Sequence, residues 1–354
     1  RRGKRLMFPS RRATIGGDKF RDEFSLAFDG SNDHVLTTFK PDYIHTNATF
    51  AMWVKMNTLS GSQTMGSHGS KRWYFGFKNT DAFIGVANAI ADNITITPTP
   101  VAGQWLHYAC TAIDGTATVY INGIAQSTTL SYTQSSATNP VDGFTIGARN
   151  DGGSIDHEMN ANISEVVQYN KGLSASEIKT LYNGREPYNH KEGVCSSNLQ
   201  AWYRMGDGAL DDRNGLVADQ TNATISNHLD DAFASDTGYS GQKTITGGQL
   251  TKDDAGLVYR DDILTISAGD VIKFTVDTES ISGTNLKAYV GATQKSISST
   301  GVNVIYINTA ATNQFIGFNN GDGSVFNSLK IDKVGANAGT TENMDADAFK
   351  GDTP

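Results

Sequence analysis

Short segments in which apolar and polar residues alternate recur along most of the chain, and they predict β-strands. Phe24–Phe28 alternates with a period of two, as a strand with one buried face does. Further apolar segments follow up to Gly147, separated by turn sequences such as Asp114-Gly115 and Asn122-Gly123, which are strong hairpin signals. The pattern predicts an antiparallel all-β fold.

One segment predicts a single short helix directly after a strand. Residues 162–169 are rich in β-branched and aromatic side chains, which is typical of a strand. Ser174 and Glu177 then have the spacing of a capping box, and Leu173 and Ile178 are placed for a hydrophobic staple. The helix should end at residues 183–184, Asn-Gly, because both tolerate positive φ angles.

A second series of strand-like segments occupies residues 257–334, after a polar, turn-rich stretch. The chain is also long enough for two domains rather than one. We therefore expect an N-terminal arm over residues 1–19, a first β-sandwich over 20–207, a linker over 208–238, a second β-sandwich over 239–335 and a polar tail over 336–354.

The composition agrees with a folded, turn-rich protein. Hydrophobic residues make up 38% and charged residues 19%, and there are 37 glycines against 7 prolines. No apolar run reaches membrane-spanning length, and no signal-peptide core is visible, so membrane insertion is not expected. Two cysteines, Cys110 and Cys195, are too few for a disulfide framework, although a bond between them stays open. Folding in a reducing compartment, or without dependence on oxidation, is expected.

Several short motifs occur in an order that resembles a known family. They are Phe28-Asp29-Gly30, Trp53-Val54, Gly103-Gln104-Trp105-Leu106-His107, Val119-Tyr120-Ile121-Asn122-Gly123, Ile146-Gly147, Ile163-Ser164-Glu165-Val166 and the capped helix. Together they resemble a laminin-G-like, concanavalin A-like lectin/glucanase domain over about residues 24–185. The resemblance implies a two-sheet antiparallel jelly roll of the kind that binds carbohydrate or protein.

Residues 199–207 resemble the segment that usually begins such domains, yet here they follow the helix. They either complete the first sandwich or open a new module, and the lack of strand partners directly after them favours the first. A laminin-G-like domain followed by this stretch resembles structural proteins of marine tailed bacteriophages. Ala268-Gly269-Asp270 and residues 331–334 resemble small carbohydrate-binding jelly rolls, which is the fold expected for the second sandwich.

No catalytic constellation is visible in the sequence. Glucanases of this fold carry clustered acids on one strand for glycoside cleavage, and no strand here has such a cluster. A non-enzymatic protein is therefore expected. The resemblance implies structural calcium held by Asp29, the Gly30 carbonyl and Glu165, since related sandwiches bind an ion between an early turn and a late strand. The alternative is a plain turn and a solvated strand residue.

The expected ligand surface is a pair of loops with aromatic and planar polar side chains, which suit sugar rings. Its candidate residues are Arg72, Trp73, Arg149, Asp151 and His157. For Trp73 the competing interpretation is a core residue, since it begins a strand.

The first twelve residues contain six cations and no acid, whereas the rest of the chain is acidic overall. A segment of this kind orders by pairing arginines with carboxylates and inserting apolar side chains into a partner. The docking residues are Arg1, Arg2, Arg5, Phe8, Arg11 and Arg12. Nucleic acid is the rival partner, but the acidic body would repel it.

These observations predict a non-enzymatic structural protein of a bacteriophage virion, a decoration or fibre of the head or tail. It would display its lectin-like sandwiches toward a glycan or host surface and bind other virion proteins, including copies of itself. The alternative is a secreted, extracellular carbohydrate-binding protein of a bacterium.

Overall fold

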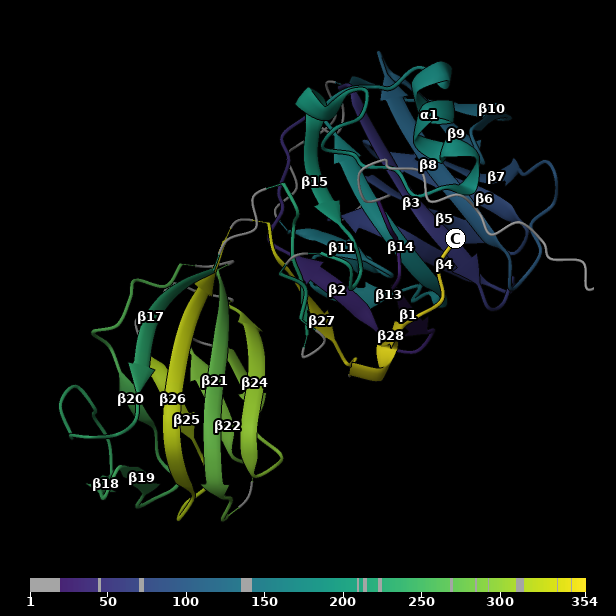
Figure 1. Cartoon of the computed structure of the whole chain (residues 1–354). Coiled ribbons are helices and arrows are strands. Elements are labelled where there is room, and N and C mark those ends of the chain that lie inside the picture. The colour runs from purple at the N-terminus through teal and green to yellow at the C-terminus, as the bar shows by residue number, and fades with distance from the viewer. Residues whose placement is uncertain are drawn as a thin grey trace, which may run out of the picture.

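In a computed structural model, drawn in Figure 1, the described residues form two β-sandwiches and one short α-helix. The structure describes residues 20–43, 46–69, 73–134, 142–208, 210–212, 215–221, 225–267, 270–283, 285–291, 293–309, 315–335, 337–344 and 346–354. The predicted fold class, an all-β jelly-roll sandwich with one short helix followed by a smaller β-sandwich, is confirmed. None of the described helices is long and apolar enough to cross a membrane.

The first sandwich packs two antiparallel sheets face to face. One sheet has the order β10 (Ile124–Ser131), β9 (Thr116–Ile121), β8 (Trp105–Ile113), β3 (Ala48–Met56), β14 (Asn160–Tyr169), β1 (Ser25–Asp29) and β28 (Phe349–Lys350), with β15 (Leu199–Tyr203) also paired to β14. The other has the order β16 (Leu216–Val217), β27 (Gly339–Glu342), β2 (His34–Thr37), β11 (Phe144–Ile146), β4 (Ser62–His68), β5 (Trp73–Lys78), β6 (Asp81–Val86) and β7 (Ala89–Thr95). A small hairpin, β12 (Arg149–Asp151) and β13 (Ser154–Asp156), follows β11.

The second sandwich is built in the same way from two smaller sheets. One contains β18 (Lys243–Thr246), β19 (Gln249–Lys252), β26 (Val325–Val334), β21 (Val271–Ser280) and β24 (Gly301–Asn308), with β17 (Ile225–Asp231) paired to β26. The other contains β20 (Val258–Arg260), β25 (Ile316–Asn319), β22 (Lys287–Val290) and β23 (Thr293–Ser296). Its core is separate from that of the first sandwich and includes the stacked rings of Phe318 and Phe326, 3.9 Å apart.

Aromatic side chains from facing strands fill the first core. The ring centroid of Phe50 on β3 lies 4.1 Å from that of Phe75 and 4.9 Å from that of Phe144, both on the opposite sheet. Cys110 is buried in this core as a free thiol, and Cys195 is also free, so the two do not form a disulfide.

The α-helix of the described residues, α1 (Ala175–Tyr182), has the predicted capping box. Ser174 Oγ accepts a hydrogen bond from the Glu177 backbone N–H, while Glu177 Oε2 accepts one from the Ser174 N–H at 2.8 Å. Leu173 and Ile178 are fully buried against the outer face of the first sheet, and Asn183 ends the helix with a φ of 48°. Short 3₁₀ turns occur at Asn183–Arg185, Ser196–Asn198 and Ala346–Ala348.

Residues 199–207 join the first sandwich, as the sequence favours. β15 pairs with the second half of β14, and β1 pairs with the first half, so both lie along the same side of one strand. Tyr203 points into the core, whereas Trp202 packs on the outer face together with α1.

The structure differs from the expected linker and tail. Residues 208–238 contain β16 and β17, and residues 336–354 contain β27 and β28, which return to the first sandwich and pair with β2 and β1. Asp352, beyond β28, forms an ion pair with Lys55. The sequence pattern did not predict these strands, because their residues are mostly polar. Pairing with an existing strand uses the backbone N–H and C=O groups and needs no alternation of apolar side chains.

Candidate functional site

The predicted ligand surface is not assembled as the sequence suggests. Trp73 is 2% exposed and packs in the first core, because alternation along β5 directs Trp73, Phe75 and Phe77 inward. It therefore has no ring face free for a sugar. Arg72 lies outside the described residues.

The other predicted ligand residues lie on or next to the β12–β13 hairpin. Arg149 Nε donates to Asp156 Oδ1 at 2.7 Å and its second nitrogen to Asp156 Oδ2 at 2.5 Å. Hydrogen bonding from Arg149 lowers the pKa of Asp156. Asp151 ends β12, and His157 follows β13 with a φ of 53°. The structure therefore brings Arg149, Asp151 and His157 to one hairpin. Arg149 is already engaged there in a bidentate ion pair.

The residues predicted to hold calcium do not meet. Asp29 pairs with Asn160 across β1 and β14, and Glu165 lies five residues further along β14, about 16 Å away at the usual rise of a strand. Asp29 Oδ1 accepts from the Ser31 N–H at 2.7 Å within a turn in which Gly30 has a φ of 84°. The described residues contain no group of three or more His, Cys, Asp or Glu side chains placed to hold a metal ion.

Glu165 instead has a structural environment. Its side chain is 3% exposed and accepts from Trp202 Nε1 at 2.6 Å and from Arg204 Nε at 2.9 Å. Both carboxylate oxygens are thus occupied by protein donors, which does not fit a calcium ligand. The φ of 51° at Glu165 coincides with a break in the β14–β3 register.

Residues 20–24, here named the strap, pass over this carboxylate. Arg204 lies over the Phe20 ring at 4.4 Å and donates to the Arg21 carbonyl, while Asp207 accepts from the Glu23 and Phe24 N–H groups at 2.8 and 2.7 Å. Ser164 Oγ lies 3.0 and 3.1 Å from the two oxygens of Asp22.

Burial determines the protonation of this cluster. Desolvation raises the pKa of Asp22 to about 9, and the neighbouring Glu165 and Asp207 carboxylates add to the effect. Desolvation also raises the pKa of Glu165 to about 7, although Arg204 opposes it. Asp22 is therefore protonated at neutral pH, and the cluster attaches the strap to the first sheet.

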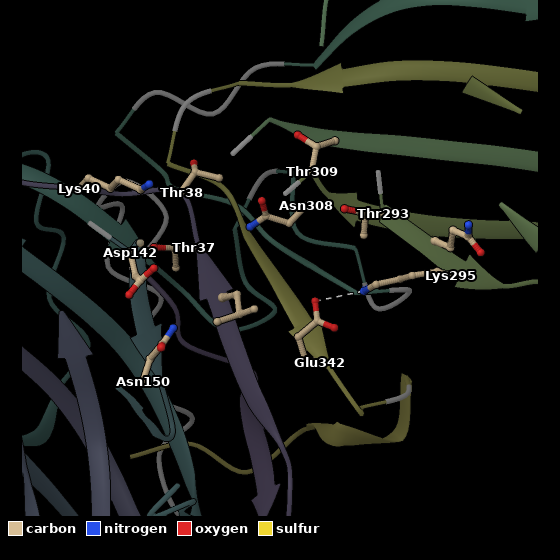
Figure 2. Close-up of a pocket in the computed structure, with 13 residues that line it drawn as sticks. Thr37, Thr38, Lys40, Asp142, Asn150, Thr293, Lys295, Asn308, Thr309 and Glu342 are labelled. Carbon is tan, nitrogen blue, oxygen red and sulfur yellow. Dashed lines mark hydrogen bonds and ion pairs between the residues drawn. The ribbon is translucent and has the colours of Figure 1, made fainter. Parts of the chain in front are cut away.

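A cleft with a volume of about 590 Å³ lies between the two sandwiches and is shown in Figure 2. The cleft is defined by Leu36, Thr37, Thr38, Lys40, Asp142, Gly143, Asn150 and Glu342 of the first sandwich and Thr293, Gln294, Lys295, Asn308 and Thr309 of the second. The floor of the cleft is the outer face of the sheet of the first sandwich that contains β2. On β2, Val35 points into the core, so its neighbour Leu36 points outward into the cleft.

Charge in the cleft is partly paired. Lys295 Nζ lies 3.1 Å from Glu342 Oε1 and crosses from the second sandwich to the first, as the dashed line in Figure 2 shows. Glu342 Oε1 also accepts from Thr340 Oγ1 at 3.1 Å. Unlike Glu342, Asp142 has a buried carboxylate oxygen, Oδ2, without a hydrogen-bond partner among the described residues.

Sequence reasoning did not find the cleft. Its residues come from five distant parts of the chain, and they are mostly Thr, Asn, Gln and Gly, which are common in turns and strand ends. No motif in the sequence marks them. The predicted docking arm, with Arg1, Arg2, Arg5, Phe8, Arg11 and Arg12, lies outside the described residues.

Many solved structures are similar to this chain, among them a pentraxin, a Bacteroides protein and a sialidase. The chain is similar to a heptameric SAP-like pentraxin from Limulus polyphemus at 16% identity and a TM-score of 0.37, over 46% of this chain and 82% of the pentraxin. It is also similar to a proposed carbohydrate-binding protein from Bacteroides ovatus at 16% identity and a TM-score of 0.43, over 57% of this chain and 56% of that protein. A sialidase from Trypanosoma rangeli gives 21% identity and a TM-score of 0.31, over 39% of this chain and 22% of the enzyme.

These likenesses concern the fold, and the matched regions span little more than half of the Bacteroides protein and less than a quarter of the sialidase. No curated protein matches the sequence. The sequence model of one family does match, over residues 29–179, which include most strands of the first sandwich and part of α1. The family whose model matches is the concanavalin A-like lectin/glucanases superfamily, and the likeness of the chain to it covers these residues.

Proposed function

We propose that this protein binds glycans without cleaving them. The family whose model matches residues 29–179 includes both lectins and glucanases. The arrangement of the carboxylates must therefore decide whether this protein only binds glycans or also cleaves them. Glycoside cleavage uses two facing carboxyl groups, one of them an acid with a raised pKa that reaches the substrate.

The observation that carries the proposal is the position of Glu165. It is the acid of β14 with a raised pKa, yet its carboxylate is sealed beneath Trp202 and Arg204 and cannot reach a glycosidic oxygen. Asp156 and Glu342 are engaged by Arg149 and Lys295. These acids are arranged for structure, which favours a lectin over a glucanase.

Two measurements on the purified full-length chain test this function. A glycan array followed by titration calorimetry should detect binding to at least one glycan, with the weak affinity expected of a shallow polar site. A reducing-end assay on the same glycans should detect no release. Cleavage of any glycan would overturn the non-enzymatic assignment, and the absence of binding across the array would overturn glycan recognition.

We further propose that the protein is displayed on a bacteriophage virion. The support is the order of its parts: a concanavalin A-like domain, then Trp202-Tyr203-Arg204-Met205-Gly206-Asp207 completing the first sandwich, with a basic segment before it. Its partners would be other virion proteins, including copies of itself, and a host-surface glycan. A secreted carbohydrate-binding protein is the competing role.

Deletion of residues 1–14 tests the virion role. The truncated protein should keep its melting temperature, because the strap and both sandwiches remain, but should no longer enter particles assembled in its presence. Normal incorporation would contradict docking through the arm. Salt-sensitive binding of the arm to DNA would favour nucleic acid as its partner.

A further inference from the structure

The cleft between the sandwiches has the lining of a site for a hydroxyl-rich ligand. Apart from Leu36 and Gly143 its lining residues are polar, and they include seven uncharged Thr, Asn and Gln side chains. Hydroxyl and amide groups both donate and accept hydrogen bonds, as sugar hydroxyls do. The volume of about 590 Å³ also falls within the usual range of small-molecule sites.

Asp142 gives a second, independent reason to place a ligand here. Its Oδ2 is buried and unpartnered among the described residues, and the side chain lines the cleft beside Lys40 and Thr37 (Figure 2). Asp142 as a whole is half-buried at the cleft wall, so its carboxylate can accept a hydrogen bond from a ligand O–H or N–H, and a hydrogen bond to a charged acceptor is stronger than one between neutral groups.

The charges narrow the class of ligand. Lys295 and Glu342 neutralise each other across the cleft, and the remaining lining charges are one cation, Lys40, and one anion, Asp142. The side chain of Lys40 is exposed, whereas Asp142 Oδ2 is buried, so the inner part of the cleft disfavours an anionic group. None of the lining residues is aromatic, which leaves hydrogen bonds as the source of recognition.

We propose that the cleft binds a neutral oligosaccharide, one hydroxyl of which donates to the Asp142 carboxylate while others contact the opposite wall at Asn308. This assignment rests on the proposed glycan-binding function and gives it a location and a ligand class. Because the walls belong to different sandwiches, the bound sugar bridges them and opposes their separation.

The test compares full-length variants by calorimetric titration. The probes are neutral gluco-, galacto- and manno-oligosaccharides, with sialylated, sulfated and glucosamine oligosaccharides titrated alongside. Asp142→Asn should weaken binding of the best neutral sugar about tenfold or more, since a hydrogen bond to a charged group is worth that factor. Asn308→Ala, on the opposite wall, should weaken it several-fold, because it removes a hydrogen bond between neutral groups. Asp92→Asn, an exposed acid of β7 outside the cleft, should leave the affinity unchanged. Melting temperatures check that each variant is folded.

Each other outcome rejects a specific part of the proposal. Glycan binding that survives both cleft variants, or that Asp151→Asn alone abolishes, would move the site elsewhere and leave the glycan-binding function standing. Binding only of acidic sugars or only of amino sugars would overturn the neutral class. Binding of no sugar at all would reject the proposed function together with this site.

Discussion

At the scale of single residues, burial decides whether a charged side chain stabilises the fold or is available to a ligand. Glu165 looks from the sequence like a strand residue with a free carboxylate, yet it lies under Trp202 with both oxygens occupied. A buried ion pair is not a large source of net stability, but removing one member leaves the other unpaired and desolvated.

Replacing Glu165 by Gln should therefore destabilise the first sandwich. The amide can still accept from Trp202, but Arg204 loses its charged partner while it remains only 14% exposed. We expect the free energy of unfolding to fall by about 1–3 kcal/mol in chemical denaturation. Glu23→Gln is the matched control, because its pair with Arg21 is exposed and should change stability by less than about 0.5 kcal/mol. Equal effects in both variants would contradict a structural role for Glu165.

Asp22 predicts how the strap responds to pH. Its pKa is raised to about 9 by burial, beside Glu165 and Asp207. Between its unfolded value near 3.8 and this folded value, the folded chain holds a proton that the unfolded chain has lost. The contribution of Asp22 to the free energy of unfolding is therefore fully present below the unfolded pKa. It falls as pH rises toward the folded pKa, by up to about 1.4 kcal/mol per pH unit.

Asp22→Asn should remove this slope. The free energy of unfolding of the variant, minus that of the parent, should grow between pH 5 and pH 9. The buried His68, His107 and His190, whose pKa values desolvation lowers to about 3, contribute equally to both proteins and cancel in the difference. A difference that does not change with pH would show that Asp22 titrates normally.

Among the elements, α1 depends on local sequence for its start and on packing for its position. Ser174→Ala removes the side-chain cap and should lower the free energy of unfolding by about 0.5–2 kcal/mol. Leu173→Ala should lower it further, because the side chain is fully buried against the sheet. Thr180→Ala, on the exposed face of the helix, is the control and should stay within about 0.5 kcal/mol. If Ser174→Ala left the free energy of unfolding unchanged, the side-chain cap would not stabilise the helix.

The strands formed by polar segments differ from the helix. β27, Gly-Thr-Thr-Glu, has no large apolar residue, yet it extends the second sheet of the first sandwich by pairing with β2 on one side and with the edge strand β16 on the other. Its side chains carry no strand signal, so only the open backbone groups of β2 decide that this segment becomes a strand. Local sequence alone could not predict it.

At the scale of the whole molecule, the two sandwiches meet at a small joint rather than along a free linker. The joint comprises Leu216, Val271, Tyr306, Val334 and Ala338. Asp212, in the connecting segment, accepts from Tyr306 Oη at 2.6 Å and from Lys273 Nζ at 3.1 Å, both in the second sandwich.

Tyr306→Phe should loosen this joint. The hydrogen bond to Asp212 is lost while the ring remains, so each sandwich should keep its fold and proteolysis between residues 208 and 238 should become faster by several-fold. Small-angle scattering should show a larger radius of gyration. Tyr289→Phe, on β22 of the same sandwich, is the control and should change neither measurement. Unchanged proteolysis in Tyr306→Phe would show that the joint is held without this hydrogen bond, by the apolar contacts and the ion pair of Lys273 with Asp212.

The sequence by itself determined the features that depend on neighbouring residues. The period-two segments, the Asp-Gly and Asn-Gly turns and the Ser174–Glu177 capping box act over a few residues, and they predicted the sandwich strands and the single helix. The ordered family motifs also identified the lectin-like domain that residues 29–179 form.

Tertiary structure alone decided what depends on distant residues. It buried Trp73, sealed Glu165, turned the expected tail into closing strands and brought Asp142 opposite Asn308 across the cleft (Figure 2). Burial, edge pairing and the convergence of loops are set by segments hundreds of residues apart, and a carboxylate's partners are known only once those segments have packed.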